Sequence, residues 1–537
     1  MWTPRWGRAL VIPCGLLFSL LPNHLAHAQS LLSTATFNGH LNKADVAFGI
    51  TVSTAGSIYA TGSTDNSSNQ NQVWTARFSS DMVFQSSHAI TSNPGSSTFG
   101  HGIVAANGKV YIVGKITSGG GDAFVARFTP DLVFESSYTF AGNAGFDDFA
   151  YGIVVDPQGT LFVVGRMVET VGGGNAWIAK LDANLILLAS ATFDSGGNDD
   201  SLWSVVRKSD GDLLAAGVVE QKKIWVGRYD TSLVLKSSTT LSGPAGCSSN
   251  AEGRGIALDS NESVYVSGQL CDASGRMAAY LAKLSPTLAF QAGVMELGDT
   301  GDSVAASVAV DAYDHVFTAG LLRLGAGNGS QWLAEYSTEM VLRSSITLNG
   351  NSGASGSINE VVPVPAPSSG VYASGYVRSP AGLDDAWLGR LQLAPPLIPA
   401  GFSNMSTNSF SASWTSAYPA GTLYYAQLST NASFAAPVLS SNTLNLSATF
   451  SGLTPNTTYY AQAATAPAGP FTSLGGTVTW VQAPTSVYFD EITTFSIVAS
   501  AYSPTPAFSN LNIGLSGTNL ARDGVYAGWH GEAWTAK

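Results

Sequence analysis

Nine residues of types that bind ligands are spread over the chain between residues 45 and 302. They are Asp45, His101, Asp148, Tyr151, Asp200, Trp203, Glu252, Arg254 and Asp302. Carboxylates gathered in a ring are ligands for Ca²⁺ and partners for sugar hydroxyls, and Tyr151 and Trp203 have flat faces on which a sugar ring can stack. Asp is also a common turn former, so the nine residues predict a site only if the fold brings them together.

The chain lacks the common catalytic motifs. It has no Gly-x-Ser-x-Gly elbow, His-Glu-x-x-His pair, P-loop or EF-hand loop. The histidines after residue 28 share no metal-ligand spacing; they are His40, His88, His101, His315 and His530. We therefore assign no catalytic residue and, beyond a Ca²⁺ ion held by an acidic ring, expect no cofactor. Glycosidase carboxylates can come from distant strands, so an enzyme stays open as an alternative.

Composition excludes some functions and predicts export. Charged residues make up 11% of the 537 residues and the formal net charge is −12, with no Lys/Arg run after residue 28, so we expect no nucleic-acid partner. Arg5 and Arg8, the apolar run 9–21 and Ala26-His-Ala28 predict a signal peptide over residues 1–28. No later stretch has the composition of a transmembrane helix. We expect a secreted or cell-surface protein.

A repeat of about 50 residues organises the chain from residue 30 to residue 394. One copy reads as four short strands, at 153–155, 161–164, 177–181 and 187–193. A glycine, here called the marker glycine, ends the second strand of each copy: Gly62, Gly114, Gly165, Gly217, Gly268, Gly320 and Gly375, spaced by 52, 51, 52, 51, 52 and 55 residues. The third strands are in phase and carry an aromatic residue: Trp74, Phe124, Trp177, Trp225, Tyr280, Trp332 and Trp387. We expect these rings to pack between sheets. In six copies a basic residue follows three positions later and faces the other side.

The two ends of the repeat region complement each other. The seventh copy lacks a fourth strand, and residues 31–39 read as a fourth strand with no first three before it. If the ends meet, the chain forms seven four-stranded sheets, and the N-terminal strand removes the open edge. We therefore predict an all-β fold, a seven-bladed β-propeller. A linear solenoid of the same repeats would need special capping repeats, and none is evident.

The repeat resembles the bacterial β-propeller repeat family over residues 30–394. The matching segments are Gly-Gly-Gly-Asp-Ala-Phe-Val-Ala-Arg-Phe at 119–128, Tyr-Thr-Phe-Ala-Gly at 138–142 and Asp-Asp-Phe-Ala-Tyr-Gly-Ile-Val-Val-Asp at 147–156. The resemblance implies a propeller in an exported protein. It implies no particular activity, because such repeats occur in proteins of many roles.

Loops on one face of this fold are expected to bind. Strand direction alternates within a sheet, so the loops that enter each first strand share a face with the second-to-third loops. These loops are long and varied, whereas the opposite face has tight turns such as Asp210-Gly211. Variable loops on a rigid scaffold commonly carry binding sites. We place the nine candidate residues at the central mouth of this face and expect a carbohydrate or protein ligand there.

A second fold follows the repeats. Residues 395–399 read as a stiff Pro-rich linker, and residues 400–482 as a small β-sandwich with Trp414 in its core. Its Leu453, Pro455 and Tyr459 fall on the Leu-x-Pro…Tyr positions of the fibronectin type III family, which this segment resembles, with Tyr459 as the tyrosine corner. Residues 483–537 restart the pattern and read as a partial second module.

The leading interpretation is an exported, non-catalytic binding or adhesion protein. Its propeller would present a loop-rich face, and the β-sandwich would act as a spacer. A carbohydrate-active hydrolase or lyase, with acidic residues at the propeller mouth, is the first alternative. A structural cell-surface component is the second.

A disulfide is predicted between Cys247 and Cys271. Both lie on the loop-rich face of the fifth repeat, and export permits oxidation. The bridge would contribute about 3 kcal/mol in the chain-entropy model. Thiol titration of the denatured, unreduced mature protein should find neither thiol reactive, and two reactive thiols would rule the bridge out.

Overall fold

The computed structural model divides the chain into two compact units, residues 1–393 and 394–537. The described residues are 10–11, 29–37, 44–65, 71–90, 97–117, 121–140, 142, 146–170, 173–196, 199–220, 223–243, 251–299, 302–324, 329–348, 355–366, 370–378, 383–393, 397–416, 423–434, 438–464, 471–481, 486–492, 497–502, 514–515 and 525–526. Cys247, most of the predicted signal peptide and most of the long loops lie outside these ranges. Every regular element within them is a β-strand, and none of their segments is a helix that could span a membrane.

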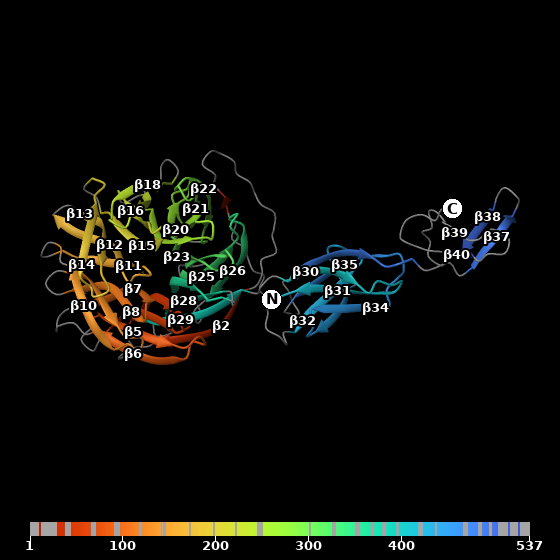
Figure 1. Cartoon of the computed structure of the whole chain (residues 1–537), viewed down its shortest axis with the longest axis horizontal. Helices are drawn as coiled ribbons and strands as arrows, with labels where there is room; N and C mark the ends of the chain where they lie inside the picture. Colours follow the sequence, from red (N-terminus) through yellow and green to blue (C-terminus); the bar gives the residue numbers. More distant parts are fainter. Residues whose placement is uncertain are drawn as a thin grey trace. The chain divides into compact units, whose positions relative to one another are not determined.

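Seven antiparallel sheets are described in the first unit (Figure 1). In chain order they are β3 (Asp45–Val52), β4 (Ile58–Asp65), β5 (Asn71–Phe78) and β6 (Phe84–Ile90); β7 (Thr98–Ala106), β8 (Lys109–Thr117), β9 (Gly121–Phe128) and β10 (Phe134–Phe140); β11 (Phe149–Val155), β12 (Leu161–Thr170), β13 (Gly173–Leu181) and β14 (Leu187–Phe193); β15 (Ser201–Arg207), β16 (Leu213–Val219), β17 (Lys223–Tyr229) and β18 (Leu235–Leu241); β19 (Glu252–Leu258), β20 (Val264–Cys271), β21 (Met277–Leu284) and β22 (Phe290–Glu296); β23 (Val304–Val310), β24 (Val316–Arg323), β25 (Gly329–Tyr336) and β26 (Leu342–Leu348); and β27 (Gly356–Pro363), β28 (Val371–Arg378) and β29 (Asp384–Leu393) with β2 (Gln29–Phe37). The two-residue strand β1 (Leu10–Val11) pairs with β22.

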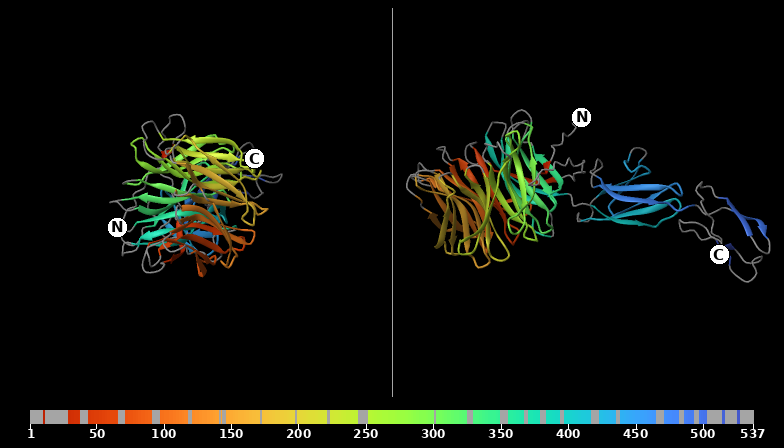
Figure 2. Two further views of the ribbon diagram at one scale, coloured as in Figure 1. Left: turned by 90° about the vertical axis from the view of Figure 1, so that its left-hand side faces the viewer. Right: turned by 90° about the horizontal axis from the view of Figure 1, so that it is seen from above.

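The first strands of the sheets pack against one another in chain order. Each packs against the first strand of the next sheet, from β3 on β7 through to β23 on β27, and β27 packs back on β3. Figures 1 and 2 show the sheets placed around a common centre. This arrangement is the β-propeller architecture. The outer strand of the seventh sheet is the N-terminal strand β2. It pairs with β29, and Thr36 lies opposite Trp387.

Aromatic rings pack between neighbouring sheets, as the repeat predicted. Trp177 of the third sheet is 1% exposed, and its ring centroid lies 4.5 Å from that of Phe140 in the second sheet. Phe37 of β2 stacks on Trp74 of the first sheet as Phe193 of the third sheet stacks on Trp225 of the fourth, with ring centroids 5.0 and 5.1 Å apart and planes 26° and 25° from parallel. The contact between the seventh and first sheets therefore repeats the contact made elsewhere in the ring.

Basic side chains also link successive sheets. In five of the seven described sheets, the residue three positions after the third-strand aromatic reaches the turn between the third and fourth strands of the next sheet; in the sixth sheet this residue is Glu335. These links join Arg77 to Asp131, Arg127 to Ala183, Lys180 to Thr231, Lys283 to Thr338 and Arg390 to Ser80. The fourth sheet differs, because Arg228 binds Asp212 of its own sheet and the link to the fifth sheet is made by Lys208 and Glu262, 2.6 Å apart.

The marker glycines have a steric cause. A Cβ atom placed on Gly62 would lie 1.9 Å from the carbonyl oxygen of Val46 in the first strand. The same distance is 1.8–2.0 Å at all seven marker glycines. No side chain fits there, so the backbones of the first two strands require glycine in every copy.

The second unit contains two facing sheets. One joins β30 (Ile398–Ser403), β31 (Ser409–Thr415) and β34 (Ser447–Ser451); the other joins β33 (Leu439–Thr443), β32 (Tyr424–Ser429), β35 (Thr458–Ala464) and β36 (Thr472–Val478). Trp414 is 1% exposed in their shared core, as predicted. The hydroxyl of Tyr459 accepts a hydrogen bond from the Thr454 N–H at 3.0 Å. Beyond this core, β37 (Ser486–Ile492) pairs with β38 (Ile497–Tyr502), and β39 (Gly514–Leu515) with β40 (Val525–Tyr526).

Cys271 is fully buried and disulfide-bonded. Because Cys247 lies outside the described residues, its pairing with Cys271 stays a prediction.

Deletion of β2 should destabilise the first unit. The deletion uncovers the edge of β29 and removes the Phe37 ring from Trp74, so the melting temperature should fall by about 10 °C or more. Calorimetry measures the change. Thr36→Ala is the control, because it trims an exposed side chain on the same strand and should have little effect. An unchanged melting temperature after the deletion would contradict a stabilising role for β2.

Candidate functional site

Each first strand contains a β-bulge near its start. In β11 the pairing with β12 shifts between Ala150 and Gly152, which leaves Tyr151 as the extra residue. The extra residues of the seven first strands, here called the bulge residues, are Phe48, His101, Tyr151, Trp203, Arg254, Ala306 and Asn359. All seven border one central cavity of about 720 Å³ between the first strands. Bulges re-aim side chains and are common beside binding sites.

The bulge residues differ in every sheet, whereas the neighbouring positions repeat. Two residues later every sheet has a β-branched aliphatic residue: Ile50, Ile103, Ile153, Val205, Ile256, Val308 and Val361. Two lining residues break the repeat. Glu360 stands one residue after the bulge, where the other six sheets have Gly or Ser, and Arg207 stands four residues after it, where the others have apolar residues. These two and the bulge residues can distinguish one ligand from another.

Five consecutive bulge residues form a continuous wall on one side of the cavity. The Tyr151 and Trp203 ring centroids are 4.0 Å apart with the planes 21° from parallel, and Arg254 Cζ lies 4.2 Å from the Trp203 ring centroid. His101 continues the wall, 5.2 Å from both Tyr151 and Phe48.

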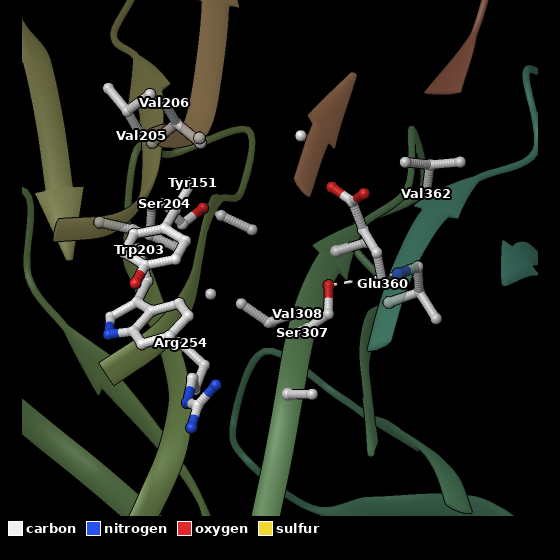
Figure 3. A pocket seen from close by; sticks show the side chains of 18 of the residues that line it. Tyr151, Trp203, Ser204, Val205, Val206, Arg254, Ser307, Val308, Glu360 and Val362 are labelled. Carbon is white, nitrogen blue, oxygen red and sulfur yellow. Dashed lines mark hydrogen bonds between the residues drawn. The ribbon is translucent and has the colours of Figure 1, made fainter. Parts of the chain in front are cut away.

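The wall does not offer the sugar platform expected of Trp203. Tyr151 and Arg254 are both too close to the indole to share one of its faces, so each covers a different face, as Figure 3 shows. The indole presents only its edge. Its Nε1–H is buried and has no hydrogen-bond partner among the described residues.

Arg254 is held in place by Glu252. Its guanidinium forms an ion pair with the Glu252 carboxylate at 2.5 Å. Glu252 does not border the cavity, so it acts through Arg254, and the pair is close to neutral in total charge. Arg254 can therefore donate hydrogen bonds more readily than it can supply a net positive charge.

His101 is a neutral member of the wall. Burial, and then the positive charge of Lys115, lower the pKa of His101 to about 4. Its Nε2 atom is buried and has no hydrogen-bond partner among the described residues. At neutral pH the imidazole therefore carries no charge and contributes mainly ring contacts.

Glu360 lies across the cavity from Tyr151, Trp203 and Arg254 of this wall (Figure 3). Its carboxylate accepts a hydrogen bond from the Ile50 N–H at 2.7 Å and so connects the seventh sheet to the first. Burial raises the pKa of Glu360 to about 8, against the smaller opposite effect of the Ile50 hydrogen bond. At neutral pH the side chain is mainly protonated and can donate a hydrogen bond.

The structure places the nine candidate residues in different environments. His101, Tyr151, Trp203 and Arg254 border the cavity, and Glu252 contacts Arg254; Asp45, Asp148, Asp200 and Asp302 do not border it. Asp45 is buried and Asp302 is exposed.

The buried carboxylates of Asp148 and Asp200 accept hydrogen bonds from backbone N–H groups. Asp148 accepts hydrogen bonds from the Gly142 and Val168 N–H groups at 2.8 and 2.7 Å. Asp200 accepts them from Ser195 and Glu220 at 2.6 and 3.0 Å. Their carboxylates are therefore occupied in fixing the connections around the first strands. Among the described residues no three His, Cys, Asp or Glu side chains form a group that could hold a metal ion.

Five residues at the cavity were missed by sequence reasoning. They are Phe48, Arg207, Ala306, Asn359 and Glu360. A signal for the bulge residues was present, because each stands 13 to 16 residues before its marker glycine. Aligning the copies position by position also isolates Glu360 and Arg207 as departures from the repeat.

No protein-family model matches this chain, and no curated protein matches it. Solved structures are similar at low identity. A protein of unknown function from Dyadobacter fermentans is 12% identical and has a TM-score of 0.41; the match covers 68% of this chain and 99% of that one. A periplasmic gluconolactonase from Pseudomonas aeruginosa is 16% identical with a TM-score of 0.39, covering 62% and 96%. A gluconolactonase from Xanthomonas campestris is 15% identical with a TM-score of 0.32, covering 55% and 86%. At these scores the similarity supports no functional argument.

Replacing Glu360 with Gln should change how stability depends on pH. The folded-state pKa of about 8 lies above the ordinary 4.5, so the folded protein keeps a proton that the unfolded chain releases. The stability from the protonated side chain is full below pH 4.5 and is lost as the pH rises to about 8. Gln does not titrate and keeps an oxygen for Ile50. The variant should melt close to wild type at about pH 5 and about 5 °C higher at about pH 9.

Glu339→Gln is the matched control, because Glu339 is exposed and hydrogen bonds lower its pKa. Its melting-temperature difference from wild type should not change over the same pH range. A constant difference for Glu360→Gln as well would contradict the raised pKa.

Proposed function

We propose that this chain is an exported, non-catalytic binding protein whose ligand enters the central cavity of a seven-bladed β-propeller. The observation that carries the proposal is the ring of bulge residues. Their backbone position repeats in all seven sheets, yet their side chains differ in every one and meet at one cavity. A scaffold that holds backbone constant while varying the side chains around a cavity suits selective binding.

Closure of the propeller by the N-terminal strand is part of the proposal. The pairing of β2 with β29, the stacking of Phe37 on Trp74 and the contact of β27 with β3 all support it. In the second unit, the strand orders β30-β31-β34 and β33-β32-β35-β36 and the Tyr459 hydrogen bond support a fibronectin type III-like spacer.

The number of carboxyl groups at the cavity favours binding over glycoside hydrolysis. Among the described residues that border it, Glu360 is the one with a carboxyl side chain. Glycosidases of the common kinds need two carboxyl groups across the scissile bond. The carboxylates of Asp148 and Asp200, which could have supplied a second, accept backbone hydrogen bonds instead.

A carbohydrate-active hydrolase or lyase is the second candidate. Glu360 supports it, because a carboxyl group that stays protonated near neutral pH can act as a general acid. Two of the similar structures are gluconolactonases, which are hydrolases, but at TM-scores of 0.32 and 0.39 the similarity carries no argument.

A glycan array combined with polysaccharide digests separates these functions. We expect binding by the wild-type protein, weaker binding by Trp203→Ala, and no product release from any polysaccharide. Trp480→Ala is the control, since Trp480 is an exposed tryptophan of the second unit. Product release that Glu360→Gln abolishes would establish the enzyme instead. If the protein neither binds a glycan nor releases a product, both the binding function and the enzyme function are contradicted. A structural surface component would then remain.

A further inference from the structure

Arg207 is an unusual residue in the lining of the cavity. It stands four residues after the bulge, where the six other sheets have Val52, Ala105, Val155, Leu258, Val310 and Pro363. It is partly buried, and its Nε atom is fully buried without a hydrogen-bond partner among the described residues. Among the described residues, no carboxylate lies within ion-pair distance of Arg207. Arg254, on the next first strand, is instead paired with Glu252.

An unpaired guanidinium beside a cavity favours an anionic ligand. A partly buried cation without a partner lowers stability, and an anion that pairs with it recovers that loss. Glu360, on the opposite side, is mainly protonated at neutral pH and does not neutralise Arg207. The lining therefore has an excess of positive charge, although the whole chain has a formal net charge of −12.

The other polar groups of the lining suit a ligand with several hydroxyls. Glu360 is mainly protonated at neutral pH and so has a hydrogen to donate. Ser307 Oγ accepts a hydrogen bond from the Val361 N–H at 3.2 Å, so its own hydrogen remains available to donate. A volume of about 720 Å³ is in the range of pockets that hold small ligands.

We propose that the central cavity binds a carboxylate-bearing sugar, a uronic acid, with its carboxylate paired to Arg207 and its hydroxyls facing the donors of Ser307 and Glu360. The inference rests on the proposed binding function and specifies its ligand class. Arginine pairs with carboxylates through two parallel hydrogen bonds, which gives the preference for acidic over neutral sugars. A free uronic acid and the acidic end of a polysaccharide present the same chemistry.

Titration calorimetry with matched sugars tests the inference. The probes are glucuronate, galacturonate and mannuronate against glucose, galactose and mannose, together with short oligogalacturonides as the polymer source. The wild-type protein should bind at least one acidic probe about tenfold or more tightly than its neutral match, and less tightly in high salt. Tight binding of the oligomer alone would identify a polysaccharide end as the source and support the inference.

Variants of Arg207 test whether this residue supplies the positive charge that pairs with the ligand carboxylate. Arg207→Gln should remove the preference for the acidic sugar. Arg207→Lys should keep part of it, because lysine keeps the positive charge but lacks the paired donors of the guanidinium. Arg276→Gln is the matched control; Arg276 is exposed and pairs with Asp272 away from the cavity. Thermal melting of each variant shows that a loss of binding is not a loss of fold.

The outcomes separate the inference from the function on which it rests. Equal affinity for acidic and neutral sugars, or an unchanged preference in a folded Arg207→Gln variant, would overturn the uronic-acid assignment and leave the binding function standing. Absence of binding to every probe would overturn the assignment, and silence on the full glycan array would remove the binding function too.

Discussion

The contact between the backbones of the first two strands underlies the rest of the propeller. In each sheet a carbonyl oxygen of the first strand lies 1.8–2.0 Å from the place where a Cβ of the marker glycine would sit. The bulge lies in the same stretch of the first strand. The glycine period of the sequence and the ring of bulge residues are therefore two results of one backbone geometry. Because glycine accommodates that geometry, the bulge side chain is free to vary from sheet to sheet.

Much of the architecture could be predicted because its causes recur along the repeat. Marker glycines, third-strand aromatics and the bases that follow them are imposed by close approach and by packing between sheets, and Trp177 and Lys180 lie where the pattern placed them. The fourth sheet was not predictable in this way, because it keeps the expected base, Arg228, yet its link to the next sheet is made by Lys208 and Glu262.

The site could be predicted only in part, for two physical reasons. A carboxylate such as Asp148 has the same appearance in a sequence whether it meets a ligand or a backbone N–H, and only burial and geometry distinguish the two. Tyr151 and Trp203 were expected to offer open ring faces, but their stacking on each other uses those faces. Glu360 and Arg207 look ordinary by themselves. They become informative only beside the equivalent residues of the other six sheets.

The pairing of β2 with β29 has a consequence for how the molecule is made. Thr36 and Trp387 are opposite each other although 351 positions separate them in the chain. Contacts of such high sequence separation slow folding. The third strand of the seventh sheet is synthesised long after β2, so the first sheet has no partner on one side until nearly the whole repeat region exists. A chain that stops early would keep two uncovered sheet faces, one at each end of an open arc, and such surfaces aggregate. The last copy of the repeat thus protects the first.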